Sequence, residues 1–179
     1  AGTNPVVDIS NAPAGTYSLW VGTYGAAFIP GYIVVTSGQS LPGALVSDLL
    51  GSASGGQTIT ATPATTSSGS LDASAAPTFS ALNLAPGFQP DPTTVAMAAG
   101  GSVNVGALNL GTACRGFVAS AADVTINYSP AGRFLRIFYQ SDADTTLVVR
   151  LPDGTFMCND DYSGRLDPLV DISAPPAGT

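Results

Sequence analysis

The chain has 179 residues, and its 12 acidic and 5 basic side chains give a formal net charge of −7 and an isoelectric point of about 4.1. Every acid is aspartate and every base is arginine, because glutamate, lysine and histidine are absent. Such a chain does not neutralise phosphates, which excludes nucleic acid as a partner, and no apolar run reaches the roughly 18 residues of a membrane span. No signal peptide is recognisable, so we expect an exported protein to be present here in a mature or excised form.

The composition predicts an all-β fold with many turns. The absence of glutamate and lysine removes two of the best helix-forming residues, whereas the chain holds 21 glycines and 14 prolines. The length suits one domain plus a linker and is sufficient for one buried core.

The first half of the chain contains a strand pair and then a stretch of different character. Residues 17–24 and 32–36 are predicted as strands, joined by residues 25–31. Residues 38–76 are rich in serine, threonine, alanine and glycine, which is typical of a linker or a lightly ordered arm, with one or two helical turns at residues 44–50.

The second half reads as a succession of short strands separated by turns. Residues 123–129 alternate apolar and polar side chains with period two, and Pro152-Asp153-Gly154 supplies a hairpin turn. The predicted strands are residues 93–97, 102–108, 123–129, 133–141, 145–151, 155–158 and 169–172.

Nearly the same phrase stands at both ends of the sequence. Residues 4–16 read NPVVDISNAPAGT and residues 167–179 read DPLVDISAPPAGT, with nine of thirteen positions identical at an offset of 163. The first copy runs on into the predicted strand 17–24, and the second stops where that strand would begin. Similarity at a fixed period is the signature of a repeat array. We therefore expect the chain to be one link of a polymer, joined by strand exchange or by tandem linkage.

Taken in repeat order, several short motifs resemble one known family. They are SDADTTL at residues 141–147, PDG at 152–154, CNDD at 158–161 and TYSLWVGTY at 16–24. Together they resemble bacterial pre-peptidase C-terminal (PPC-like) domains, which are secreted β-sandwich or jelly-roll modules found behind extracellular proteases and in tandem on surface proteins. The resemblance covers about residues 77–179 and 17–37. It implies an extracellular bacterial protein with an antiparallel β-sandwich or jelly-roll fold.

The order of the motifs differs from that of the family, in which the WVGTY strand follows the C-terminal phrase. We therefore predict three parts: residues 1–37 as a strand pair that completes a neighbouring sandwich, 38–76 as the linker or arm, and 77–179 as a sandwich that lacks its last strands. An open sheet edge favours the addition of a strand from another chain. The residues expected to make this inter-subunit strand are Tyr17, Leu19, Trp20, Val21 and Tyr24.

Cys114 and Cys158 are the only cysteines. A reactive thiol would lack a histidine or lysine to activate it, and a metal site would have two thiols and no histidine. The sequence therefore favours an intradomain disulfide, which indicates an oxidising compartment.

Seven of the twelve aspartates lie between positions 142 and 171, several of them in the loops 141–144 and 159–161. Clustered carboxylates repel one another, and Ca²⁺, a hard cation with six to eight oxygen ligands, would relieve that repulsion. The alternative is that these residues cap turns and keep the surface soluble, as we expect for Asp153 in its own turn. The preferred calcium ligands are Asp142, Asp144, Asp160, Asp161 and Asp167.

The inventory of side chains argues against an enzyme. Without histidine or lysine, neither a Ser-His-Asp nor a Ser-Lys nucleophile can be built. We expect a structural subunit of an extracellular filament or surface fibre, whose partners are identical units. The alternative is a calcium-dependent accessory or glycan-binding module of a secreted hydrolase or adhesin. The aromatic residues that could form a glycan platform, or could instead be core residues, are Tyr17, Trp20, Tyr24, Phe134, Phe138 and Tyr139.

Overall fold

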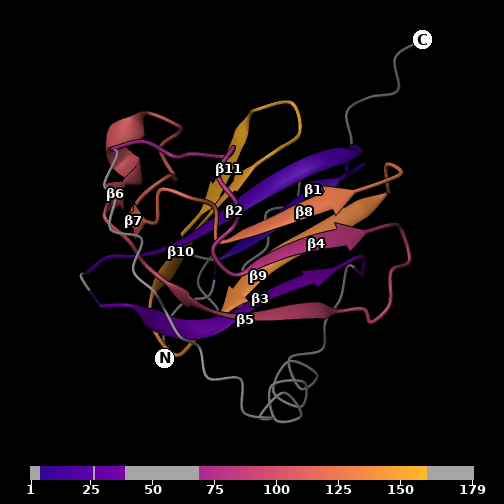
Figure 1. Cartoon of the computed structure of the whole chain (residues 1–179), viewed down its shortest axis with the longest axis horizontal. Coiled ribbons are helices and arrows are strands. Elements are labelled where there is room, and N and C mark those ends of the chain that lie inside the picture. The colour runs from indigo at the N-terminus through magenta and orange to yellow at the C-terminus, as the bar shows by residue number, and fades with distance from the viewer. Residues whose placement is uncertain (1–4, 26, 39–68, 161–179) are drawn as a thin grey trace.

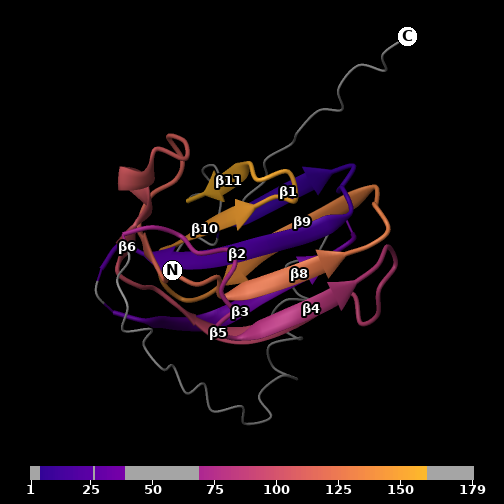
Figure 2. The same cartoon turned by 45° about the horizontal axis from the view of Figure 1, so that its top comes forward.

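A computed structural model describes residues 5–25, 27–38 and 69–160 of the chain as two β-sheets packed face to face (Figures 1 and 2). This confirms the predicted all-β sandwich. The first sheet, sheet A, has the order β1–β9–β3–β5, and all its pairs are antiparallel. The strands of sheet A are β1 (Val6–Ser10), β3 (Ile29–Thr36), β5 (Thr93–Ala99) and β9 (Phe134–Gln140).

Sheet B is built around β2 (Gly15–Thr23), which pairs with β10 along one edge. Along its other edge β2 pairs with β8 over the first half of its length and with β7 at Thr23. All pairs are antiparallel except β4 with β8, which is parallel. The remaining strands of sheet B are β4 (Ser80–Leu84), β6 (Val103–Asn104), β7 (Phe117–Val118), β8 (Val124–Tyr128), β10 (Thr145–Arg150) and β11 (Phe156–Asn159).

Residues 102–108, predicted as one strand, form only the two-residue β6 followed by a 3-10 helix over Val105–Leu108. The Asn104 side chain caps that helix by accepting a hydrogen bond from the Gly106 amide at 3.0 Å, and Asn109 ends it in the left-handed conformation. Asparagine is well suited to both positions, and it overrides the apolar alternation that predicted a strand. The expected strand at residues 169–172 and the helical turns at 44–50 lie outside the described residues.

The main core fills the space between the two sheets. Because side chains alternate along a strand, Tyr17, Leu19 and Val21 of β2 point into this core and are fully buried. Strands β1, β3, β5, β8, β9 and β10 contribute most of the other buried members, and Ala12 and Phe88 join them from outside the strands. Burying one such apolar side chain stabilises the fold by about 1.5–3 kcal/mol.

A second apolar cluster lies on the outer face of sheet B. Trp20 of β2 is fully buried there, packs beside Phe156 of β11, and donates its indole N–H to the Ser120 carbonyl at 3.1 Å. Residues of the segment that contains β6, the 3-10 helix and β7 complete the cluster. The predicted disulfide is confirmed: Cys114 in this segment is bonded to Cys158 in β11.

The strand pair that was expected to complete a neighbour occupies the centre of both sheets. In this single chain β2 lies between β10 and β8, and β3 lies between β9 and β5. Residues 15–36 therefore lie in the same sandwich as residues 80–159. The registers of β2 and β3 with their partner strands would be the same if this strand pair came from a neighbouring chain.

The disulfide should contribute a large share of the stability, because it closes a loop with a sequence separation of 44 residues. On the chain-entropy description, a loop of that size is worth about 4 kcal/mol. We expect the C114S/C158S variant to lose about that much free energy of unfolding in urea titrations followed by tryptophan fluorescence. Reduced wild-type protein is the matched comparison. An unchanged unfolding midpoint would contradict the prediction.

Candidate functional site

The hairpin of β10 and β11 brings the acidic loops to one end of sheet B. Leu147 is the register partner of Asn159, so the loop before β10 and the residue after β11 lie at the same end of the hairpin. Asp142 and Asp144 are exposed, and Asp160 is half-buried and accepts a hydrogen bond from the Tyr24 hydroxyl. The expected grouping of the two loops is therefore present at the level of the backbone.

The structure describes three of the five expected calcium ligands, since Asp161 and Asp167 lie outside the described residues. Within the described part of the chain, no three acidic or cysteine side chains are close enough together to hold a metal ion. One further oxygen lies at this end of the sheet: the Thr145 hydroxyl, next to Asp144, is buried and has no hydrogen-bond partner among the described residues.

Two other aspartates serve local turns. Asp153 accepts hydrogen bonds from the amide and the hydroxyl of Thr155 at 2.9 and 2.7 Å, and Asp72 does the same for Ser74 at 2.9 and 2.6 Å. These hydrogen bonds lower the pKa of both carboxyl groups, because they favour the ionised form. Asp153 thus belongs to its own turn, as expected from the sequence.

Four of the six aromatic residues considered for a glycan platform are buried. Tyr17, Trp20 and Tyr139 are fully enclosed, and Phe138 is 6% exposed, so these four act as packing residues. A different aromatic group is exposed around Thr23: Tyr24 follows it in sequence, Phe117 is its register partner, and Phe28 lies close by against Gly100. Sequence reasoning missed Phe28 and Phe117, because alternation alone does not tell an exposed aromatic from a buried one.

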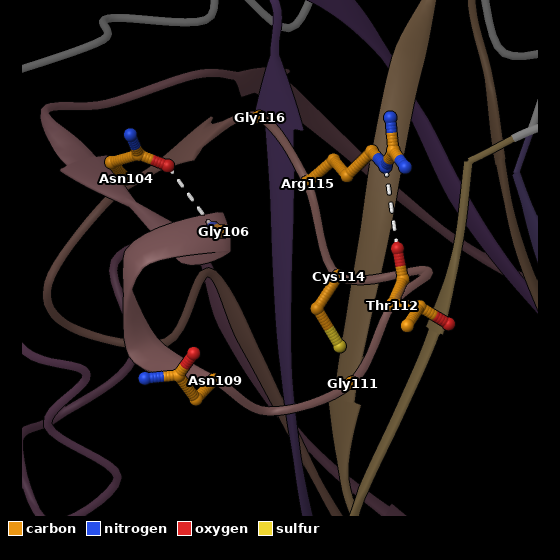
Figure 3. A pocket seen from close by; sticks show the side chains of 8 residues that line it. All are labelled: Asn104, Gly106, Asn109, Gly111, Thr112, Cys114, Arg115 and Gly116. Atoms are coloured by element: carbon orange, nitrogen blue, oxygen red, sulfur yellow. Dashed lines mark hydrogen bonds between the residues drawn. The ribbon is translucent and has the colours of Figure 1, made fainter.

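A pocket of about 580 Å³ lies beside the disulfide (Figure 3). Asn104 and Gly106 form one side, and Thr112, Cys114 and Arg115 form the other. The Arg115 Nε donates to the Thr112 carbonyl at 3.3 Å, and most lining residues are exposed. The pocket offers hydrogen-bonding groups and one cation, but its described lining contains no aromatic side chain and no carboxylate.

Asp123 is a buried acid that the sequence did not single out. It lies directly before β8 with 1% exposure, and its Oδ2 accepts a hydrogen bond from the Val21 amide at 2.7 Å. Its own amide donates to the Leu19 carbonyl at 2.8 Å, so Asp123 fixes β8 against the centre of β2. Burial raises the pKa of its carboxyl group to about 8, and the hydrogen bond from Val21 opposes that rise.

A buried ion pair joins the edge strand β1 to β9. Both guanidinium contacts of Arg136 with the two carboxylate oxygens of Asp8 are 2.6 Å long. The two side chains are 11% and 6% exposed, and the Arg136 guanidinium also lies over the Phe134 ring, 5.6 Å from its centroid. Nothing in the local sequence pattern predicted this pair, because its members are 128 residues apart.

Comparison of the chain with protein-family models, with curated proteins and with solved structures gave no match. Among the described residues, no helix has the length and apolar character that crossing a membrane would need.

The buried carboxyl group of Asp123 should make stability depend on pH. The pKa of the Asp123 carboxyl group is about 8 in the folded chain and near 3.8 in the unfolded chain. At a pH between these two values, the folded chain therefore holds a proton that the unfolded chain has lost. Stability should therefore fall as the pH rises from about 5 to about 8, by at most about 1.4 kcal/mol per pH unit. Urea titrations at several pH values measure this slope.

The D123N variant should lack this slope, because an amide does not titrate. The D153N variant is the control: Asp153 is exposed and its pKa is lowered, so the slope between pH 5 and 8 should match the wild type. Equal slopes in wild type and D123N would show that Asp123 does not carry the effect.

Proposed function

We propose that this protein is a structural subunit of an extracellular bacterial filament or surface fibre, related to the PPC-like domains that its motifs resemble. Its units are joined to identical units by strand complementation or by tandem linkage. Calcium in the acidic loops and the disulfide stabilise each unit. The single observation that carries the proposal is the repeated phrase, read together with the fold of its first copy.

In the structure, the first copy is a strand followed by a turn. Its strand is β1, which pairs with β9 over five residues. Its turn is held by hydrogen bonds from the Asn11 amide to the Arg133 carbonyl and from the Gly132 amide to the Ala12 carbonyl, at 2.7 and 2.8 Å. The Tyr17 hydroxyl donates to the Pro13 carbonyl at 2.7 Å and fixes the exit into β2. The phrase is thus a complete structural element with a defined place against β9.

The sequence contains two copies of this element, and the described residues offer one place for it. A second copy that is excluded from that place in its own chain would find an equivalent place in an identical chain once it displaces the β1 of that chain. This supports association between copies of the chain, in which each unit supplies an element that another unit accepts. A repeated element at a fixed offset is equally expected where units follow one another in a tandem array.

A glycan-binding or adhesive module is the second candidate. The exposed aromatic side chains around Thr23, namely Tyr24, Phe28 and Phe117, favour it, because sugars stack on exposed rings. The two functions differ in their partner: a fibre subunit associates with copies of itself, whereas an adhesive module binds sugar as a monomer.

Electron microscopy and sedimentation velocity of the purified full chain test the fibre proposal. We expect fibres, or at least oligomers that grow with protein concentration. A truncated chain of residues 1–160 keeps every described strand but lacks the second copy, so it should fold with its disulfide and remain monomeric.

A full chain that stays monomeric at every concentration would contradict assembly by strand complementation. In that case, native material in which this sequence forms part of a longer polypeptide of repeated units would favour tandem linkage. Glycan binding by that monomer would favour the adhesive module.

Calcium should raise the melting temperature of the full chain, and chelation should lower it, because a ligand that binds only the folded state stabilises it. At a hundredfold excess over the dissociation constant the gain is about 2.7 kcal/mol. The D142N/D144N variant should lose calorimetric binding. The D72N/D153N variant is the matched control, since it removes the same charge from turns elsewhere. Equal binding by both variants would place the ion outside the acidic loops.

A further inference from the structure

Strand β1 is the edge of sheet A, and it is held along one side. Among the described strands its only partner is β9, over five residues, whereas β2 and β3 each lie between two partners. We call the place that β1 occupies against β9 the β1 slot. An edge strand of this length can leave and be replaced with less disruption than a central strand, because fewer backbone hydrogen bonds break.

Three kinds of contact hold β1 in the slot. Val7 and Ile9 point into the main core and are 2% and 4% exposed. Asp8 points to the opposite face and meets Arg136. The Val6 amide donates to the Asn159 side chain at 3.0 Å, where β11 ends.

The second copy of the phrase keeps the residues that make these contacts. At the offset of 163, Val170 and Ile172 correspond to the core residues Val7 and Ile9, and Asp171 corresponds to Asp8. The substitution at the first strand position is conservative, from Val6 to Leu169. The acid that Arg136 binds is therefore present in both copies, within the same apolar pattern.

The second copy also keeps the glycine that ends the turn, where β2 begins in the first copy. Gly15 has a φ of +141°, and a Cβ there would lie 2.5 Å from the Pro152 side chain, so only glycine fits. The second copy has Gly178 at this position.

The copies differ at Asn11, whose φ of +51° is left-handed and where the second copy has Ala174. They also differ at the fully buried Ala12, where the second copy has Pro175. Alanine adopts the left-handed conformation less readily, so the second copy is the weaker occupant.

We propose that residues 169–173 of one chain pair with β9 of a second copy of the chain, in place of residues 6–10, with Asp171 bound to Arg136. This inference rests on the proposed function and identifies the segment and the side chains that join the units. The β1 slot thereby becomes the binding site for an identical partner, rather than the centre of the sandwich that residues 17–37 occupy.

Arg136 sets the register of the incoming strand. A shift by one residue would turn the apolar side chains away from the core, and a shift by two would take the acid away from the guanidinium. An arginine that is 11% exposed loses much of its hydration, so leaving it without a carboxylate is costly. The arginine therefore selects a strand with an acid between two inward apolar residues, which is the pattern of both copies.

The exchange changes the free energy of the slot little, because the incoming strand restores nearly every interaction that the outgoing strand made there. Protein concentration and the packing between the bodies of neighbouring units then decide the balance, as in domain swapping. The slightly weaker turn of the second copy is consistent with a chain that keeps its own β1 when dilute and exchanges it when concentrated.

Engineered cysteines test the pairing directly. Ser10 and Phe134 are register partners, and the hydrogen bonds of the neighbouring pairs show that theirs is a non-hydrogen-bonded pair, in which the Cα atoms lie closest. A disulfide fits such a distance. In the full chain, the S10C/F134C variant should cross-link within one chain, and the F134C/S173C variant should cross-link between chains.

Non-reducing gels, with mass spectrometry of the linked peptides, give the result. A ladder of multimers from F134C/S173C that grows with concentration supports the proposal. A link within one chain would overturn it, and so would the absence of any link while S10C/F134C links fully. Electron microscopy of the same samples distinguishes the failure of this inference from the failure of the proposed function. Fibres that form without this cross-link would refute the exchange of the second copy but not the fibre function.

Charge reversal provides a second, independent measurement. The D8R/R136D variant keeps an ion pair between β1 and β9, but its slot then repels Asp171. Its assembly should fall at least tenfold while its melting curve stays cooperative, and adding D171R should restore assembly. Unchanged assembly in D8R/R136D, or no recovery in the triple variant, would overturn the proposed contact.

Discussion

The fold depends on β2, because this strand is covered on both faces and paired along both edges. Its last seven residues, from Tyr17 to Thr23, are all buried. The inward side chains fill the space between the sheets, and Trp20 on the other face anchors the layer that covers sheet B. The Asp123 carboxyl group accepts a hydrogen bond from the Val21 amide and the Asp123 amide donates to the Leu19 carbonyl, so both hold the backbone on either side of Trp20. Removing β2 would therefore open two apolar clusters at once.

Much of the fold could be predicted from the sequence, because alternation is a local signal. The strands at residues 124–128, 134–140, 145–150 and 156–159 agree with the predicted ranges to within two residues. β1 was missed as a strand although the equivalent residues 169–172 were predicted as one, and β4 was missed because its residues are only half-buried. Period two is visible only where one face is strongly apolar.

The contacts of the candidate sites were less predictable, because they join distant residues. Two cysteines in a chain without histidine or lysine left few alternatives, and so the disulfide could be predicted. The contact of Asp8 with Arg136 and that of Asp123 with β2 depend on strand order, which no local pattern encodes. The exposure of Phe28 and Phe117 likewise depends on what the sandwich leaves uncovered.

The described aspartates divide into structural and peripheral groups. Asp8 and Asp123 are buried and hold strands together, Asp72 and Asp153 cap turns, and Asp91 accepts hydrogen bonds from the amide and the hydroxyl of Ser37. The acids that remain, Asp142, Asp144 and Asp160, gather at one end of the β10–β11 hairpin. The described aspartates thus have several separate structural roles, and only the group at the end of the β10–β11 hairpin bears on calcium.

If units are joined as proposed, the position of the first copy of the repeated phrase in the fold explains why a short segment would be enough to join them. A central strand such as β2 cannot be exchanged without opening both apolar clusters. In contrast, β1 contributes two side chains to the main core, Val6 to a smaller cluster, one ion pair and one backbone ladder. A second copy of β1 with its turn would therefore reproduce most of these contacts in few residues. The same feature limits the strength of the joint, because a second copy competes with an intramolecular strand that makes nearly identical contacts. Such a joint would be specific because the buried arginine requires an acid in the incoming strand. It would be reversible because the chain's own β1 competes for the same place. Stable fibres would then require further contacts between the bodies of adjacent units.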